Sequence, residues 1–114
     1  MSILHYQRGC IRGTNVNACQ DLKISGEQIL ENWWRKEGHR IDVGDVTDIL
    51  AASPEVVVVG TGYAGFVEVS SSFRSALTNQ NIQLIAKKTA EAVKTFNQLH
   101  SQGKRVAGAF HLTC

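Results

Sequence analysis

Residues 55–65 read Glu-Val-Val-Val-Val-Gly-Thr-Gly-Tyr-Ala-Gly, and this stretch decides the fold. Four consecutive valines are more apolar than a strand with one face in water tolerates, so they predict a strand buried on both faces. Pro54 precedes the strand, and Gly60 and Gly62 end it where the backbone needs extra freedom. In an open α/β sheet, ligands usually bind beside the loops that leave the carboxyl ends of such strands. The stretch therefore predicts a central strand and a place for a pocket.

Length and composition indicate one globular domain over residues 1–114. Of the 114 residues, 43% are apolar and 19% are charged, which is typical of soluble proteins with a core that needs no metal or disulfide. The formal net charge of +2 does not point to nucleic acid or a membrane, and we expect neither as a partner. No apolar run approaches transmembrane length, and the first residues lack the layout of a signal peptide. A cytoplasmic location is therefore expected.

The three cysteines, Cys10, Cys19 and Cys114, are an odd number without C-x-x-C spacing. This predicts free thiols in a reducing cytosol and no disulfide framework. Combining His39 or His111 with a cysteine suggests a thiol nucleophile or a metal site. No spacing fits zinc, however, and no third group can be assigned to orient a Cys–His pair. We expect no metal and no cofactor.

The first half of the chain predicts strands followed by one short helix. Residues 3–35 alternate loosely between apolar and polar side chains, with turns at Gly, Asn and Ser, so antiparallel hairpins are expected there. Asp45 and Asp48 resemble the capping box at the start of a helix with one apolar face. This helix is expected to stop at Ser53, because the residue before Pro54 avoids helical geometry.

The second half alternates between helices and strands. The expected elements are a helix from the serines at 70–72 to about residue 80, a strand at 82–85, a long helix that Thr89 caps and Gly103 ends, and a strand at 105–110. This order favours a mainly parallel sheet with helices packed on it and right-handed crossovers. The N-terminal hairpins must then extend that sheet or cover one of its edges.

Gly60, Gly62 and Gly65 have the spacing of the dinucleotide-binding fingerprint, and they follow a predicted strand. Their surroundings differ from that motif, because residues 66–69 are too rich in β-forming side chains for the third glycine to open a helix. A nucleotide site and a plain glycine turn after a buried strand both remain as interpretations.

A lysine-rich turn, Lys87-Lys88-Thr89, lies where a later strand passes to a helix. If the two strands are neighbours, this turn and the glycine loop line one pocket, in which a lysine would pair with an anion and His39 or Tyr63 would move a proton. Backbone amides at the glycines would face the ligand. The alternative is a solvated turn whose threonine only caps the helix. The candidate pocket residues are Gly60, Thr61, Gly62, Tyr63, Lys87, Lys88, Thr89 and His39.

Trp33, Trp34 and Arg35 form an aromatic and basic run. Such a run can bind single-stranded nucleic acid, but the small net charge favours another interpretation. One tryptophan would then lie in the core and its neighbour on the surface. Tryptophan contributes strongly at protein interfaces, so the exposed member of the pair is expected to mark an interface with a partner.

Four segments carry a family resemblance: Trp33-Trp34-Arg35-x-x-Gly38-His39-Arg40, Val56-Val57-Val58-Val59-Gly60-Thr61-Gly62, Thr89-x-x-Ala92-x-x-x-x-Asn97, and Gly108-Ala109-Phe110-His111-Leu112-Thr113-Cys114. In this order they resemble the Mth938-like family, small proteins of unknown function from archaea, bacteria and mitochondria. The resemblance covers nearly the whole chain. It implies a three-layer α/β fold, with a mixed central sheet of about five strands, one of them antiparallel. Helices would pack on that sheet, and the N-terminal part would add a small β-layer.

The resemblance implies protein interaction more than catalysis. A mitochondrial relative assists assembly of respiratory complex I, and an animal cytosolic relative is linked to fat-cell differentiation. We expect this chain to be a prokaryotic, cytoplasmic member without the N-terminal extension of a mitochondrial import signal. We therefore expect an accessory or assembly-type protein that contacts a protein partner or forms a homo-oligomer, and not an enzyme. The alternative is a protein or enzyme that binds a nucleotide or another small anion at the carboxyl ends of the central strands.

Overall fold

The computed structural model describes residues 4–7, 9–13, 16–25, 28–31, 33 and 40–112. In chain order its elements are β1 (His5–Gln7), β2 (Cys10–Gly13), β3 (Val16–Ala18), β4 (Leu22–Ser25), β5 (Gln28–Leu30), β6 (Arg40–Ile41), the 3-10 helix η1 (Val43–Asp45), α1 (Thr47–Ala51), β7 (Val56–Thr61), β8 (Glu68–Val69), α2 (Ser71–Asn79), β9 (Gln83–Lys87), α3 (Thr89–Ser101) and β10 (Val106–His111). Within these ranges, no helix is long and apolar enough to cross a membrane.

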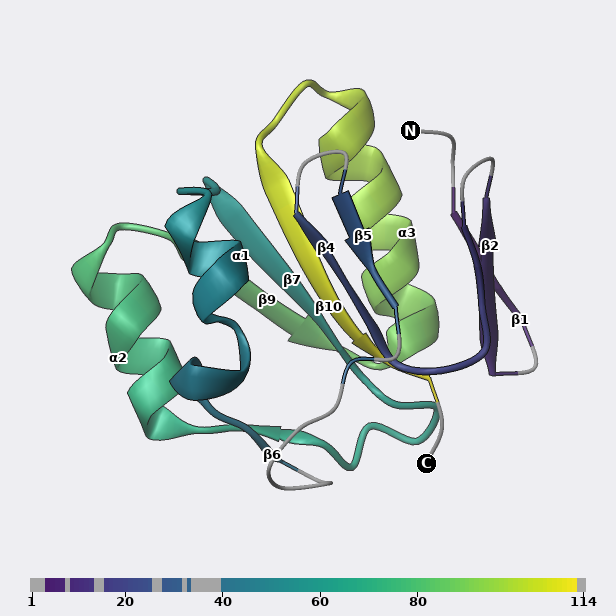
Figure 1. Ribbon diagram of the computed structural model, residues 1–114, viewed down its shortest axis with the longest axis horizontal. Helices are drawn as coiled ribbons and strands as arrows, with labels where there is room; N and C mark the ends of the chain where they lie inside the picture. The colour runs from purple at the N-terminus through teal and green to yellow at the C-terminus, as the bar shows by residue number, and fades with distance from the viewer. Residues whose placement is uncertain are drawn as a thin grey trace.

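The central sheet has five strands in the order β5-β4-β10-β7-β9 (Figure 1). Strands β10, β7 and β9 run parallel to one another, and β4 is antiparallel to both of its neighbours. The sheet is therefore mixed with one antiparallel strand, as the family resemblance implies. Strand β7 pairs with β10 on one side and β9 on the other, so the valine strand is internal, as predicted.

The valine strand divides its side chains between two apolar cores. Val56 and Val58 lie in the core that includes Phe96 of α3, whereas Val57 and Val59 lie in the core that includes Leu77 of α2. Figure 1 shows the corresponding layers, with α3 on one face of the sheet and α1 and α2 on the other. Every residue of β7 is buried, which confirms the prediction from four consecutive valines.

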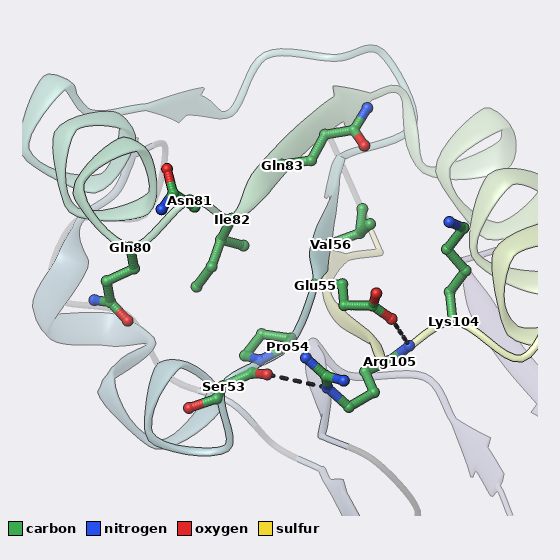
Figure 2. Close-up of a pocket in the computed structure, with 10 residues that line it drawn as sticks. All are labelled: Ser53, Pro54, Glu55, Val56, Gln80, Asn81, Ile82, Gln83, Lys104 and Arg105. Atoms are coloured by element: carbon green, nitrogen blue, oxygen red, sulfur yellow. Dashed lines mark hydrogen bonds between the residues drawn. The ribbon is translucent and has the colours of Figure 1, made fainter.

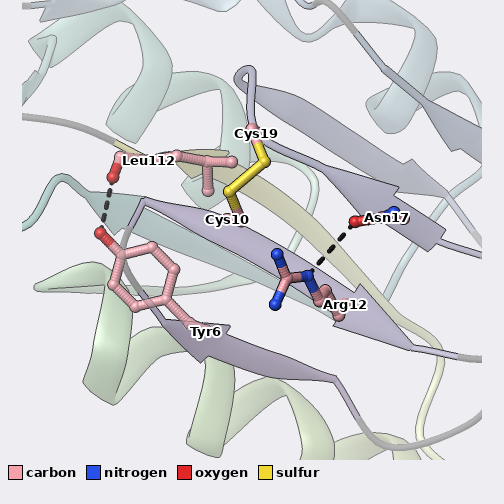
Figure 3. The surroundings of a disulfide bond; sticks show 6 residues. All are labelled: Tyr6, Cys10, Arg12, Asn17, Cys19 and Leu112. Carbon is pink, nitrogen blue, oxygen red and sulfur yellow. Dashed lines mark hydrogen bonds between the residues drawn. A yellow bond between two sulfur atoms is a disulfide. The ribbon is translucent and has the colours of Figure 1, made fainter.

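The N-terminal hairpins form a separate three-stranded sheet, β1-β2-β3, beside α3. Cys10 and Cys19 form a disulfide across this sheet, with Cα atoms 4.1 Å apart (Figure 3). The prediction of free thiols is therefore wrong for these two residues. The reason is the antiparallel register of the hairpin: Ile11 pairs with Ala18, so Cys10, which precedes Ile11, lies opposite Cys19, which follows Ala18. Cys114 lies outside the described residues.

The start of the first helical segment differs from the sequence-based expectation, whereas that of α2 does not. The capping box lies one turn earlier than predicted, because the Asp45 carboxylate accepts the backbone N–H of Asp42 at 2.9 Å, at the start of η1. Asp48 instead accepts a bond from the Lys23 ammonium at 2.8 Å, which links α1 to β4. The start of α2 agrees with the prediction, since Ser70 is its N-cap residue.

Candidate functional site

Two aromatic side chains stand exposed on the loop that leaves the carboxyl end of β7. Tyr63 is 76% exposed and Phe66 is 69% exposed. The loop is shaped by Gly62 and Gly65, whose φ angles of 102° and 81° are ones that residues with side chains rarely adopt. We call residues 62–66 the aromatic loop. Neighbouring exposed aromatic side chains are typical of surfaces that bind another molecule.

Thr89 fixes the base of the aromatic loop. Its fully buried Oγ1 accepts the N–H of Gly62 at 2.9 Å and donates to the carbonyl of His111. The backbone N–H of Thr89 also donates to the carbonyl of Gly62, at 3.1 Å. The prediction that Thr89 caps α3 is therefore wrong: Lys88 is the N-cap residue, and the hydroxyl of Thr89 points into the protein and joins β7 to β10.

The other end of the loop is fixed by the chain as it enters β8. The N–H of Val67 donates to the carbonyl of Thr61 at 3.0 Å, and the Val67 side chain is buried in the core beside α1 and α2. The aromatic loop is thus held at both of its ends by hydrogen bonds. The backbone that carries the two aromatic side chains is therefore already ordered before a partner binds.

A mostly buried Asp21–His111 pair lies behind this base. The Asp21 carboxylate is 2.6 Å from Nδ1 of His111 and accepts the backbone N–H of Leu112 at 2.9 Å. A carboxylate beside an imidazole is the arrangement that orients a general base. Here the pair also ties the end of β10 to the turn before β4. Sequence reasoning missed Asp21, because its two partners lie about ninety positions further along the chain.

The network continues to Tyr6 of β1. Its phenol donates to the carbonyl of Leu112 at 2.6 Å (Figure 3). Burial, then the neighbouring Tyr63 and Asp21, raise the pKa of Tyr6 above its ordinary value. The N-terminal sheet, the end of β10 and the aromatic loop therefore meet in one region of the surface.

The raised pKa of Tyr6 predicts a loss of stability at alkaline pH. A folded-state pKa above the unfolded value gives a contribution that is complete below about pH 10 and is lost as the pH rises through the folded pKa. We expect the free energy of unfolding to fall above about pH 10, and to fall less steeply in Tyr6→Phe. Urea unfolding of both proteins between about pH 8 and pH 11 measures this difference. Equal pH dependence of the two proteins would contradict the assignment.

The structure brings the predicted lysine turn and glycine loop together, because β7 and β9 are neighbours. The hydroxyl of Thr61 donates to the carbonyl of Lys87 at 3.0 Å. The stem of Lys88 lies over Gly65, where an added Cβ would be 3.1 Å from Cγ of the lysine. This part of the predicted site is therefore assembled, with both lysines exposed to solvent.

The predicted amide cradle for an anion does not fit this arrangement. The N–H of Gly62 already donates to Thr89, so it is not directed at a ligand. Gly60 pairs with Phe110 and Lys87 inside the sheet, where an added Cβ would lie 2.9 Å from Oγ1 of Thr89. Gly60 therefore allows close packing of β7 against Thr89, and Gly62 allows the loop to turn.

Trp33 is 9% exposed and lies in the core beside α1 and α2, in agreement with the expectation that one tryptophan of the pair is buried. Its backbone N–H donates to the carbonyl of Asp21 at 2.8 Å, and the ammonium of Lys23 lies 5.5 Å from the centre of its ring. Trp34, Arg35 and His39, also predicted as site residues, lie outside the described residues. Among the described residues, no three His, Cys, Asp or Glu side chains form a group that could hold a metal ion.

A family model described as a protein of unknown function (DUF498/DUF598) matches residues 3–111. The chain belongs to this family. Solved structures of similar proteins also include a Mth938-like domain from Bordetella pertussis, with a TM-score of 0.69, 18% identity, and coverage of 97% of this chain and 85% of that one. The resemblance to the Mth938-like family is thereby confirmed.

Two further solved structures share the fold over nearly their whole length. A conserved hypothetical protein from Pyrococcus horikoshii matches with a TM-score of 0.85 and 22% identity, covering 100% of both chains. A protein from Bartonella henselae, described as an outer membrane protein, matches with a TM-score of 0.82 and 21% identity, covering 99% of this chain and 96% of that one. At these identities, the similarity establishes the fold of this family member and nothing about its activity.

Proposed function

We propose that this protein is a non-catalytic accessory protein that binds a protein partner through the aromatic loop. The observation that carries the proposal is the exposure of Tyr63 and Phe66 on a loop whose two ends are fixed by hydrogen bonds. An aromatic side chain buries about 150–250 Å² when covered. A loop that is already ordered loses little entropy on binding, so more of this burial contributes to affinity.

The charges beside the loop indicate the kind of protein surface that fits it. Lys87 and Lys88 are exposed at the adjoining strand end, and the stem of Lys88 lies against Gly65 of the loop. A partner with an apolar patch bordered by carboxylates would complement both features. An anion pocket at this same end is less favoured, because the N–H of Gly62 is directed at Thr89.

We expect Tyr63→Ser combined with Phe66→Ser to weaken partner binding strongly without unfolding the protein. We expect the loss of two exposed aromatic side chains at the centre of an interface to weaken binding by about a hundredfold or more. Truncating one such residue typically makes the free energy of binding less favourable by about 2 kcal/mol or more. Affinity capture from a lysate, followed by calorimetry with the purified partner, measures the effect. The melting temperature of the variant should stay close to that of the parent.

A matched control truncates two long exposed side chains elsewhere, Arg74→Ser in α2 and Lys94→Ser in α3. This control should retain the partner at the affinity of the parent. A second copy of the chain is one possible partner, and light scattering of the parent and the loop variant identifies that case. Equal capture by the loop variant and the control would contradict the proposal.

A further inference from the structure

A cleft of about 470 Å³ opens at the opposite end of the central sheet, where β7 and β9 begin (Figure 2). Cavities of roughly 300–1,000 Å³ hold small molecules in proteins. The cleft is separated from the aromatic loop by the six residues of β7, about 20 Å of strand. It is therefore distinct from the surface proposed above for a protein partner.

The cleft combines apolar side chains with a polar rim. Pro54, Val56 and Ile82 line it and are buried by the surrounding protein. Figure 2 shows Asn81 on one side of the cleft and Gln83 at its upper edge. Such a lining suits a small molecule with a short apolar body and a few polar groups.

The charges at the cleft favour an anion. Lys104 and Arg105 carry two positive charges, and Glu55 carries one negative charge. The Glu55 carboxylate accepts the backbone N–H of Arg105 at 2.8 Å, which lowers the pKa of this carboxyl group and keeps it ionised. Within the described residues, the ammonium of Lys104 takes part in no ion pair. The three charged side chains thus give the cleft one net positive charge, and the charge of Lys104 also acts on Glu55 and helps to lower its pKa.

A second hollow and the ends of two helices adjoin the cleft. A second hollow, of about 250 Å³, shares Pro54, Lys104 and Arg105 with the first, so both cations lie between two hollows. Ser53 and Asn81, the non-glycine residues with positive φ in the described chain, both line the first cleft, with φ of 52° and 57°. Each of them follows the C-cap residue of a helix, α1 and α2 respectively, where a residue with positive φ commonly ends the helix.

We propose that this cleft binds a small organic monoanion, a carboxylate with a short apolar body. The carboxylate pairs with the ammonium of Lys104 and with the Nη groups of Arg105, whose Nε donates to the carbonyl of Ser53 at 3.4 Å. The apolar body rests on Pro54, Val56 and Ile82. The ionised Glu55 repels a second negative charge, so the cleft selects monoanions over dianions.

The test uses 4-methylpentanoate as the probe, with its neutral amide 4-methylpentanamide and the dianion glutarate as comparisons. Methyl and amide chemical shifts of the full chain are followed by NMR during titration. We expect saturable shifts at Val56 and Ile82 with the carboxylate, and binding of the amide and of glutarate at least about tenfold weaker. Shifts confined to other residues, no saturation at millimolar probe, or equal binding of the amide would overturn the proposal.

Two matched lysine variants complete the test. Lys104→Gln removes the charge at the cleft, and Lys94→Gln removes the same charge from the exposed middle of α3. We expect Lys104→Gln to weaken the probe about tenfold and Lys94→Gln to leave its affinity unchanged. Both side chains are exposed, so both variants should keep the fold of the parent. Equal effects of the two variants would show a general charge effect and would contradict the assigned site.

Discussion

Phe110→Ala is expected to lower the free energy of unfolding by about 3–5 kcal/mol. The ring of Phe110 is fully buried and packs edge-on against Phe96 of α3, with ring centroids 5.7 Å apart. It also lies against Gly60 and Gly108, where an added Cβ at Gly60 would be 3.0 Å from the ring. Its removal leaves a cavity between β7, β10 and α3 that backbone and helix cannot close. Urea unfolding measures the loss.

Gly108→Ala supplies the control for this packing. A Cβ at Gly108 would overlap the ring of Phe110 and lie 3.3 Å from Phe96. We therefore expect Gly108→Ala to lower the free energy of unfolding by about 1–3 kcal/mol. In a protein that already carries Phe110→Ala the overlap is gone, so Gly108→Ala should lower the free energy of unfolding much less there. If the cost of Gly108→Ala is the same in both backgrounds, then Phe110 does not pack over Gly108 as described.

Thr89→Val is expected to lower the free energy of unfolding by about 2–4 kcal/mol. The valine keeps the shape of the threonine but removes the hydroxyl, which leaves the N–H of Gly62 without its acceptor and the carbonyl of His111 without its donor. Each buried group that loses its partner costs about 1–3 kcal/mol. Hydrogen exchange at the Gly62 amide should also become faster, because the base of the aromatic loop is loosened.

Thr95→Val, in the same helix, is the matched control. Thr95 is only half-buried, and its hydroxyl accepts one long bond, 3.4 Å, from the Lys87 ammonium. The control should change stability by less than about 0.5 kcal/mol. If Thr89→Val melts like this control and Gly62 exchanges at the parent's rate, the hydroxyl of Thr89 does not hold the loop.

Much of the fold could be predicted because its signals are local. Four consecutive valines require apolar surroundings on both faces, and the structure provides a core on each side of β7. Ser70 begins α2, and Gly103, with φ of 78°, follows the last turn of α3. These features depend on a few neighbouring residues, so the amino-acid sequence alone indicates them.

The errors concern contacts between distant residues. A carboxylate at Asp48 is equally suited to cap a helix or to pair with a lysine, and only the packing of α1 on β4 directs it to Lys23. The spacing of Cys10 and Cys19 does not reveal the hairpin register that brings them together. A threonine at the start of a helix suggests a cap, but Thr89 faces two strand ends that supply other partners.

The sequence predicted that the glycine loop and the lysine turn lie next to each other, but it did not predict which side chains are exposed there. The adjacency of the glycine loop and the lysine turn followed from expecting two neighbouring parallel strands, which the structure contains. The exposure of Phe66 could not be predicted, because the β-rich segment around it suggested a strand interior and Val67 beside it is buried. Which of the two tryptophans lies in the core could not be predicted from their adjacent positions; Trp33 is buried in the core beside α1 and α2, with the ammonium of Lys23 of β4 near its ring.

The central claim is that the aromatic loop binds a protein partner. Site-specific photo-crosslinking tests it most directly, with p-benzoylphenylalanine placed at Phe66 and, as a control, at Lys94 on the exposed surface of α3. We expect irradiation in cells to yield one dominant crosslinked protein from position 66, and we expect the control not to yield it. No crosslink from position 66, or the same set of crosslinks from both positions, would contradict the claim.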